Sequence, residues 1–300
     1  MKDNSQLKGT IITLFGASCW GLCAVAGKYV MNEKGVDPVW MVTLRLLLAG
    51  SILLIIGIIK SRGNGILNIW RDKSSVLRLI AVAALAFAVC QTTYFAAISY
   101  ANAGIITAIQ QTAPAFVLIW ALISEKRLPR LAELVILAVV IFGAFMLSTN
   151  GDISALSIPA IALILALISA VTSAMYSIMP RPLLIKYGTF PAVGWGMILA
   201  GIMLVPVAKL WVGSGTWDIQ TIGAFGFVVI FGTVIAFGSY LYGITIVGSL
   251  KGSIYGLIEP VVSAFASALL LHQSLTFIEI CGVLAIMIGV ATLAISHNKE

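Results

Sequence analysis

The feature that most constrains this chain is the segment 79–124, which contains no charged side chain. It is more than twice as long as the roughly 20 apolar residues that one helix needs to cross a bilayer. Of the 300 residues, 60% are hydrophobic and only 10% are charged, and the mean hydropathy is +1.08. A globule of this size cannot bury so much apolar surface, so we exclude a soluble enzyme, a disordered chain and a coiled coil. An integral membrane protein remains.

Other apolar runs, each with at most one charged side chain, divide the rest of the chain into helix-sized segments. The runs are continuous rather than alternating between apolar and polar residues, which argues against a β-barrel. The predicted spans are 9–27, 38–59, 79–124 (two spans with a turn near 100–104), 134–149, 157–179, 190–211, 219–250 (with a tight turn at 248–249), 252–271 and 277–295. We therefore predict an all-α integral membrane protein with ten transmembrane helices.

The distribution of positive charge predicts the orientation. The net charge is +7, from 18 Lys and Arg against 11 Asp and Glu. Ten spans place both termini on one side. If that side is cytoplasmic, 14 basic residues lie inside, Lys28, Lys34 and Lys209 lie outside, and Arg45 lies within the membrane. The positive-inside rule then predicts a multi-pass protein of the cytoplasmic membrane with both termini in the cytoplasm. The same rule explains the basic excess without a nucleic-acid partner.

Two kinds of residue are expected to anchor the spans at the membrane surfaces. Lys28 lies near the outer end of the first span, where its ammonium group could snorkel to the interface. Trp40, Trp211 and Trp217 fall at predicted outer ends and Trp70 and Trp120 near inner ends, as in an aromatic belt.

The sequence offers little catalytic or metal-binding chemistry. The four cysteines all fall in apolar runs, which argues against a disulfide framework or a zinc site: Cys19, Cys23, Cys90 and Cys281. His272 and His297 lie at span ends, and neither an HExxH motif nor a Ser–His arrangement is present. We expect no enzyme activity, no catalytic residue, no metal and no cofactor.

Weak self-similarity divides the chain near its middle. Tyr94 aligns with Tyr240, Thr107 with Ser253 and Pro114 with Pro260, at a constant offset of 146 residues (from 94 to 240). We predict two five-helix halves, 1–150 and 151–300. Because five is odd, the second half must enter the membrane upside down. This inverted-topology repeat is typical of secondary transporters that work by alternating access.

Several motifs along the chain resemble those of one family. They are Ala17-Ser-Cys-Trp-Gly21, Tyr94-Phe95, Ala97-Ile-Ser-Tyr-Ala101, Thr112-Ala-Pro114, Glu125-Lys-Arg-Leu128 and Glu259-Pro260. Together, and over the whole chain, they resemble the EamA family of the drug/metabolite transporter superfamily. The resemblance implies ten helices, cytoplasmic termini, a central cavity between inverted halves, and export of small metabolites, often amino acids, with import in some relatives. The second half departs from the pattern, since Leu271-His-Gln-Ser274 lacks the Glu that follows the fourth span of the first half.

Two charged residues fall deep within predicted spans, where a charge is costly and usually functional. Arg45, in the second span, is expected to contact an anion or carboxylate in the cavity. The alternative is a structural bond to a helix carbonyl or to Glu259. Glu259, in the ninth span, is a candidate coupling residue, because a carboxylate in a low dielectric can exchange a proton near neutral pH. The alternatives for Glu259 are a salt bridge to Arg45 and a polar cap beside the kink at Pro260.

Further polar and aromatic residues within spans are candidates for substrate binding, because polar side chains facing lipid are costly. Trp20 could form the floor of the cavity, or it could serve only in helix packing. The other candidates are Gln91, Tyr94, Gln110 and Gln111 of the first half and Tyr240, Tyr242 and Tyr255 of the second.

These residues suit a small zwitterion. We expect a secondary transporter that moves an amino acid or related zwitterion across the cytoplasmic membrane by alternating access, in the direction of export. The alternatives are an importer of a small organic cation or other metabolite, and a channel-like facilitator. Its expected partners are the substrate, membrane lipid and a candidate coupling proton, and the chain is expected to be a monomer or homodimer.

Overall fold

A computed structural model describes residues 2–61, 65–126, 128–152, 157–247, 252, 255–273 and 275–296. Within these residues the chain forms helices and no strand. In the described part of the chain, seven helices are long and apolar enough to cross a membrane: Gln6–Asn32, Pro38–Lys60, Lys73–Tyr100, Ala103–Ser124, Ala160–Tyr187, Thr189–Ala208 and Ile219–Tyr240. Three shorter apolar helices are Glu133–Thr149, Ile258–Leu271 and Phe277–Thr292. The prediction of an all-helical membrane protein is confirmed.

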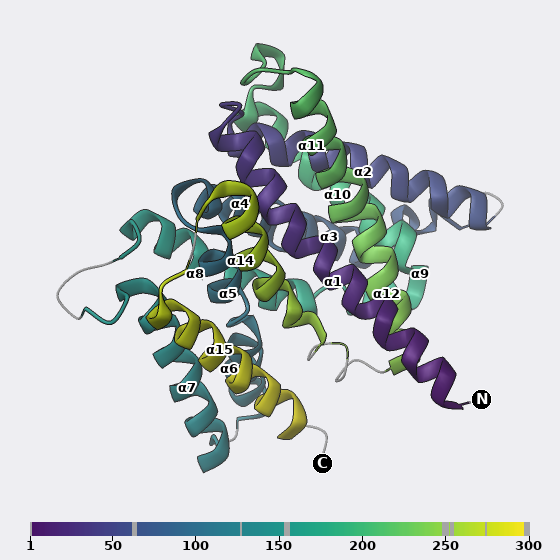
Figure 1. The fold of residues 1–300 in the computed structure, drawn as a ribbon. Coiled ribbons are helices and arrows are strands. Elements are labelled where there is room, and N and C mark those ends of the chain that lie inside the picture. The colour runs from purple at the N-terminus through teal and green to yellow at the C-terminus, as the bar shows by residue number, and fades with distance from the viewer. Residues whose placement is uncertain are drawn as a thin grey trace.

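The helices follow one another with short connections (Figure 1). The first part of the chain contains α1 (Lys2–Asn32), α2 (Pro38–Ser61), η1 (Asn68–Arg71), α3 (Lys73–Ala81), η2 (Val82–Val89), α4 (Cys90–Tyr100), α5 (Ala103–Gln110), α6 (Ala113–Glu125) and α7 (Leu131–Thr149). The second part contains α8 (Ala160–Ile178), α9 (Arg181–Tyr187), α10 (Thr189–Ala208), η3 (Leu210–Val212), α11 (Ile219–Val229), η4 (Ile230–Ile235), α12 (Ala236–Val247), α14 (Ile258–Leu271) and α15 (Phe277–Ser296).

Short polar side chains cap the N-terminal ends of several helices. They accept hydrogen bonds from backbone N–H groups that have no partner within the helix. Asp72 accepts from the amide of Ser74 at the start of α3. Asn102 does the same for Gly104 at the start of α5, which confirms the turn expected near 100–104. The tight turn expected at 248–249 lies outside the described residues, as do Ser253 and Ser274.

Three irregularities interrupt helices that the sequence analysis treated as continuous. The third and eighth predicted spans each contain a π-helical segment, η2 and η4. The fourth predicted span is broken at Gln111 and Thr112, just before Pro114 begins the next helix. Proline is well placed there because its missing N–H would have no partner in the first turn. Wide turns and breaks free backbone carbonyls, which in a membrane interior need other partners.

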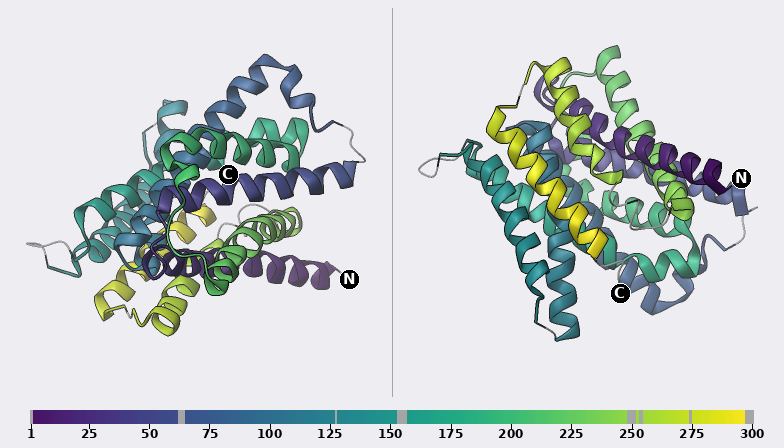
Figure 2. Two further views of the ribbon diagram at one scale, coloured as in Figure 1. Left: turned by 90° about the horizontal axis from the view of Figure 1, so that it is seen from above. Right: turned by 60° about the horizontal axis from the view of Figure 1, so that its bottom comes forward.

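The helices pack in matching pairs between the two parts of the chain. α1 lies against α11, η4, α12 and α14, while α8 lies against η2, α4, α5 and α6. α2 runs along α10, and α7 runs along α15. Figure 1 and the right view of Figure 2 both show α7, in teal, beside α15, in yellow.

Small residues allow close helix contact between α7 and α15. A Cβ atom placed on Gly143 would lie 2.8 Å from the backbone oxygen of Gly282. A Cβ atom placed on Gly282 would lie 2.9 Å from that of Gly143. Such reciprocal contact through glycine is typical of helix association in membranes, where van der Waals packing replaces the hydrophobic effect.

Lys28 differs from its expected role as an interfacial anchor. Its side chain is buried, and its ammonium group donates a hydrogen bond to the backbone oxygen of Ala101. That carbonyl follows the end of α4, where helix carbonyls have no partner within the helix. The expectation was wrong because the sequence does not show that α4 ends beside this part of α1.

Candidate functional site

Arg45 lies on α2 at the centre of a buried polar network. The residue is 3% exposed. Its Nε donates to the hydroxyl of Thr233 at 2.8 Å, and a terminal guanidinium nitrogen donates to Gln91 Oε1 at 3.0 Å. The other terminal nitrogen lies 3.5 Å from the carbonyl oxygen of Gly232, and the guanidinium stands 5.0 Å from the centre of the Phe95 ring. The planar guanidinium can bond several acceptors in fixed directions at once, which an ammonium group cannot do.

The partners of Arg45 come from both parts of the chain and lie at both π-helical segments. Gly232 and Thr233 belong to η4, and Gln91 lies just after η2. Of the alternatives considered for Arg45, the structure supports the bond to a helix carbonyl and excludes the ion pair with Glu259. Both residues are described, and no such pair is among the salt bridges of the described residues.

Glu259 lies in the first turn of α14 and is buried. Its Oε2 accepts a hydrogen bond of 3.0 Å from Nε2 of Gln111. Gln111 occupies the break between α5 and α6, so the bond joins two irregular helix ends from different parts of the chain. Gly21 of α1 presses against the same turn, since a Cβ atom there would lie 2.6 Å from the backbone oxygen of Glu259.

The face of α14 that carries Glu259 also carries two further polar side chains. Ser263 and Ser267 follow at intervals of four, which places all three on one side of the helix. Both serines are fully buried, and their hydroxyl groups have no hydrogen-bond partner among the described residues. Neither serine was predicted as a site residue, although the spacing of four residues from Glu259 is visible in the sequence.

Tyr94 and Tyr240, aligned by the internal repeat, make similar contacts. The hydroxyl group of Tyr94 lies 2.8 Å from that of Thr107, between α4 and α5. The Tyr240 hydroxyl donates to the carbonyl oxygen of Gly252 at 3.1 Å. In each part of the chain, therefore, the tyrosine ties its helix to the segment that follows.

Trp20, on α1, packs against aromatic rings of α12. Its ring centre lies 5.1 Å from that of Phe237 and 4.7 Å from that of Tyr240. The Tyr176 ring of α8 continues the cluster, 6.0 Å from Phe237. Trp20 therefore joins an aromatic cluster that spans three helices.

The remaining candidates are divided among different neighbourhoods. Gln110 donates to the hydroxyl of Ser169 on α8 at 2.6 Å, so it does not share the partner of Gln111. The hydroxyl of Tyr255 accepts from Thr10 at 3.3 Å, near the start of α1. Tyr242 is 52% exposed. Residues two apart on a helix point about 200° apart, so the side chain of Tyr242 points away from that of Tyr240.

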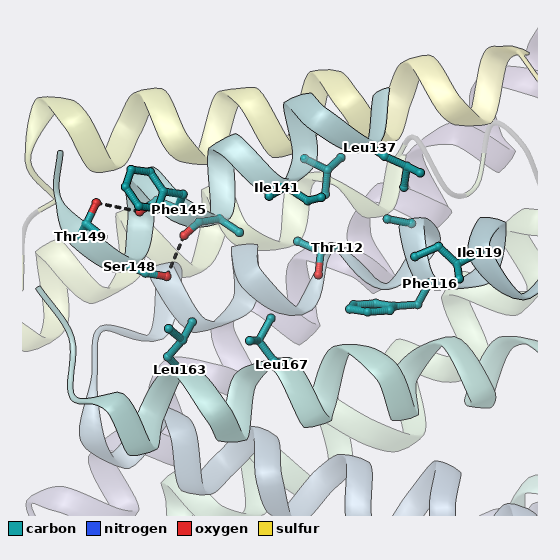
Figure 3. A pocket seen from close by; sticks show the side chains of 13 residues that line it. Thr112, Phe116, Ile119, Leu137, Ile141, Phe145, Ser148, Thr149, Leu163 and Leu167 are labelled. Carbon is teal, nitrogen blue, oxygen red and sulfur yellow. Dashed lines mark hydrogen bonds between the residues drawn. The ribbon is translucent and has the colours of Figure 1, made fainter. Parts of the chain in front are cut away.

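A separate groove of about 530 Å³ lies between α6, α7 and α8. In Figure 3, Phe116 and Ile119 face Ile141 across it, and Leu163 and Leu167 line another wall. Its hydroxyl groups already donate to nearby backbone carbonyls: Thr112 donates to Ile109, Ser148 to Ala144 and Thr149 to Phe145. The groove is therefore apolar, and none of the sequence-predicted site residues lines it.

The cysteines and acidic residues do not form a metal centre in the described part of the chain. Cys19, Cys23, Cys90 and Cys281 are free thiols. No three His, Cys, Asp or Glu side chains come together there as a metal ion would require.

Extending the internal repeat adds two matched pairs of acidic residues that the sequence analysis missed. The offset of 146 residues aligns Glu133 with Glu279 and Asp72 with Asp218. Glu133 and Glu279 each accept from a backbone amide at the start of α7 and α15, at 2.8 and 2.7 Å. Asp72 and Asp218 are the N-terminal capping residues of α3 and α11. The signal was present in the sequence, because the same offset had already aligned Tyr94 with Tyr240.

Long apolar helices around a buried polar network define a multi-pass membrane protein. Comparison with known proteins identifies its class as a transporter. The sequence model of the EamA-like transporter family matches residues 7–149 and again 160–295. The chain belongs to this family, as the resemblance in its motifs predicted.

Individual relatives match over nearly the whole chain. A protein of Salmonella typhimurium named as an uncharacterized inner membrane transporter, YicL, is 30% identical over 99% of this chain and 98% of its own length. A protein of Archaeoglobus fulgidus named as an uncharacterized transporter is 25% identical over 95% of this chain and 98% of its own. A crystal structure at 16% identity superposes with a TM-score of 0.65 and covers 97% of this chain and 98% of that one, which supports the fold alone.

Proposed function

We propose that this transporter moves a small zwitterion, an amino acid or a related metabolite, out of the cell by alternating access. The proposed architecture is ten transmembrane helices in two inverted halves, 1–150 and 151–300. The observation that carries the proposal is a pair of buried polar contacts between the halves: Arg45, bonded to Gln91, meets Thr233, and Gln111 meets Glu259.

The packing pattern supports the inverted repeat. α1, the first helix of one half, contacts the third and fourth spans of the other half, and α8 does the same in return. α2 pairs with α10, and α7 with α15, which are equivalent helices of the two halves. The separate family matches to 7–149 and 160–295 agree with this division. Two halves related in this way can exchange conformations, which would open a central site to each side in turn.

The charges in the network support the choice of substrate. Arg45 offers a buried cation that a substrate carboxylate could approach, and Glu259 offers an acidic group that an amine could approach. Arg45 already uses neutral acceptors and Glu259 a neutral donor, so neither charge is neutralised by the other. A zwitterion carries complementary charges for both.

A thermal-shift screen tests the substrate class on purified protein. Ligands that bind the folded state raise its apparent stability by mass action, by about 2.7 kcal/mol at a concentration 100 times Kd. We expect one or more amino acids to raise the melting temperature and to lose this effect in Arg45→Met. Stabilisation by sugars or by simple amines, with none by amino acids, would contradict the proposal.

Cysteine labelling tests the proposed orientation. Leu67, after α2, and Val212, after α10, are both well exposed, at 63% and 72%. In intact cells, a reagent that cannot cross the membrane should label Val212→Cys and not Leu67→Cys, because the positive-inside count places them on opposite faces. The reverse pattern would overturn the orientation and, with it, the direction of export.

The role proposed for Glu259 is to carry the coupling proton. In proteoliposomes with a pH gradient, Glu259→Gln should exchange substrate but should lose gradient-driven transport. Glu279→Gln is the matched control, because Glu279 is equally buried, at 8% exposure, yet only caps α15. Gradient dependence that survives in a stable Glu259→Gln protein would end the coupling proposal.

A further inference from the structure

Two polar stations that solvent reaches in part, built on the same plan, join the two halves outside the buried network. Asp72 and Asp218, aligned by the offset of 146 residues, begin α3 and α11. Three residues later, the hydroxyl of Ser75 donates to Asp72 at 2.7 Å, and that of Thr221 donates to Asp218 at 2.8 Å. Each station therefore starts from the same aspartate and hydroxyl motif at the start of an equivalent helix.

Each aspartate pairs with a lysine of the other half. Lys186, from α9, lies 2.7 Å from Asp72, and Lys34, from the loop after α1, lies 2.7 Å from Asp218. Lys186 holds the pKa of Asp72 down to about 2, and Lys34 holds the pKa of Asp218 well below its usual range. Both contacts are therefore ion pairs at neutral pH.

Aromatic residues complete both stations in the same way. Trp40 of α2 packs at 5.3 Å on Trp217, which directly precedes Asp218. Trp195 of α10 packs at 5.2 Å on Trp70, two residues before Asp72. α2 and α10 are equivalent helices in the proposed halves, so these tryptophan pairs form matching contacts between the halves.

Tyrosines add hydrogen bonds beside the lysines. Tyr187 donates to the hydroxyl of Ser75 at 3.0 Å in one station. Tyr29 donates to Gln220 at 3.0 Å in the other, and Gln220 also accepts from Lys34 at 3.0 Å. In both stations the half that supplies the lysine also supplies a tyrosine.

The stations lie at opposite ends of α2. Trp40 stands near the start of this helix, which has 24 residues and is therefore about 36 Å long. At its other end, a Cβ atom on Gly57 would lie 3.3 Å from Ile66, whose carbonyl accepts from Trp195. In the proposed topology, the Lys34–Asp218 station faces outward and the Lys186–Asp72 station faces the cytoplasm.

We propose that these stations are latches, one on each face, and that the transport cycle opens them in turn. The proposal rests on alternating access. It adds that the closed state of each face is held by an ion pair between halves rather than by the substrate site. Exposed ion pairs are weak and are screened by salt, which suits a contact that must break in every cycle.

Distances between spin labels test the latches without substrate. Labels at Glu33 and Ile219 span the outer station, and labels at Ile185 and Leu77 span the inner one; all four side chains are exposed. Pulsed electron paramagnetic resonance in nanodiscs then reports the opening of each face. The test variants are Asp218→Asn and Asp72→Asn, because asparagine caps a helix as well as aspartate does but cannot form the ion pair.

We expect Asp218→Asn to raise the open fraction of the outer face by up to about fivefold and to lower that of the inner face, and Asp72→Asn to do the reverse. Lys34→Met and Lys186→Met, which remove the basic partner of each ion pair, should have the same effects as Asp218→Asn and Asp72→Asn. Lys209→Met, which removes an exposed charge from the outer face, should change neither. Unchanged distances in all four latch variants would overturn the latches. If each variant opened its own face while the other face stayed unaffected, the latches would stand and their alternation would be refuted.

Discussion

Replacing Arg45 by lysine or by methionine tests the buried network. We expect the lysine variant, which keeps the positive charge, to be the less stable of the two. The guanidinium reaches acceptors on two segments, Gln91 after η2 and Thr233 in η4. Lysine keeps the charge, but its compact ammonium group cannot reach both acceptors at once. Methionine removes the charge and keeps much of the side-chain volume. We expect Arg45→Lys to be less stable than Arg45→Met.

The magnitude follows from counting the groups left without a partner. In Arg45→Met, Thr233 still donates to the carbonyl of Val228 at 3.0 Å, so Gln91 Oε1 is the main acceptor that loses its bond. Losing the partner of a buried neutral group costs about 1–3 kcal/mol. A buried charge that loses its partners costs about 3–5 kcal/mol. The lysine variant should therefore be less stable than the methionine variant by about 2 kcal/mol.

Thermal unfolding of the purified variants measures this difference. For a chain of this size, 2 kcal/mol corresponds to a melting temperature lower by about 3 °C. Lys209→Met serves as the control for the loss of an exposed cation and should melt like the wild type. If Arg45→Lys melts above Arg45→Met, the charge itself is stabilised by an anionic group, and the network of neutral acceptors described above is wrong.

Three further predictions follow from close contacts and charges. Gly21→Ala should destabilise the protein by about 1–3 kcal/mol in thermal unfolding, because the new Cβ would lie 2.6 Å from the backbone oxygen of Glu259. Gly223→Ala, with no atom within 4 Å of the new Cβ, should be neutral or slightly stabilising. Trp20→Ala should lower the initial rate of substrate uptake without reducing the amount of protein in the membrane, since the Trp20 ring packs in the interior. Normal uptake by this variant would show that Trp20 serves only in helix packing. Because the pKa of Asp72 is lowered to about 2, its ionised carboxylate stabilises the fold fully above the usual carboxyl pKa, and this stabilisation is lost only as the pH falls toward about 2. The inner label distances should therefore stay constant from about pH 5 to about pH 8.

Much of the fold could be predicted because uncharged length alone decides which segments enter a membrane. The turn at Asn102 was readable as well, since asparagine and glycine punctuate an otherwise apolar run. The π-helical segments could not be predicted from the sequence. A change of the backbone hydrogen bonds from the α-helical to the π-helical pattern requires no fixed pattern of residues. The break at Gln111 had only Pro114 as a local signal.

The candidate site was predicted in its residues but not in its pairings. Arg45 and Glu259 stood out because intramembrane charges are rare. Their partners, Thr233 and Gln111, depend on which helices of different halves meet, and a single sequence does not fix that. Tyr242 was included with Tyr240 as a second-half counterpart of the polar cluster around Tyr94, but two positions along a helix nearly reverse the direction of a side chain.

Counterflow in proteoliposomes tests alternating access most directly. Vesicles are loaded with unlabelled ligand, chosen as the amino acid with the largest thermal shift, and are diluted into a trace of the labelled form. A carrier with one site exposed to each side in turn predicts a transient accumulation of label inside, above its outside concentration, while the unlabelled ligand leaves. Label that enters only to equal concentration, at a rate independent of the unlabelled ligand inside, would show a channel and would contradict the account.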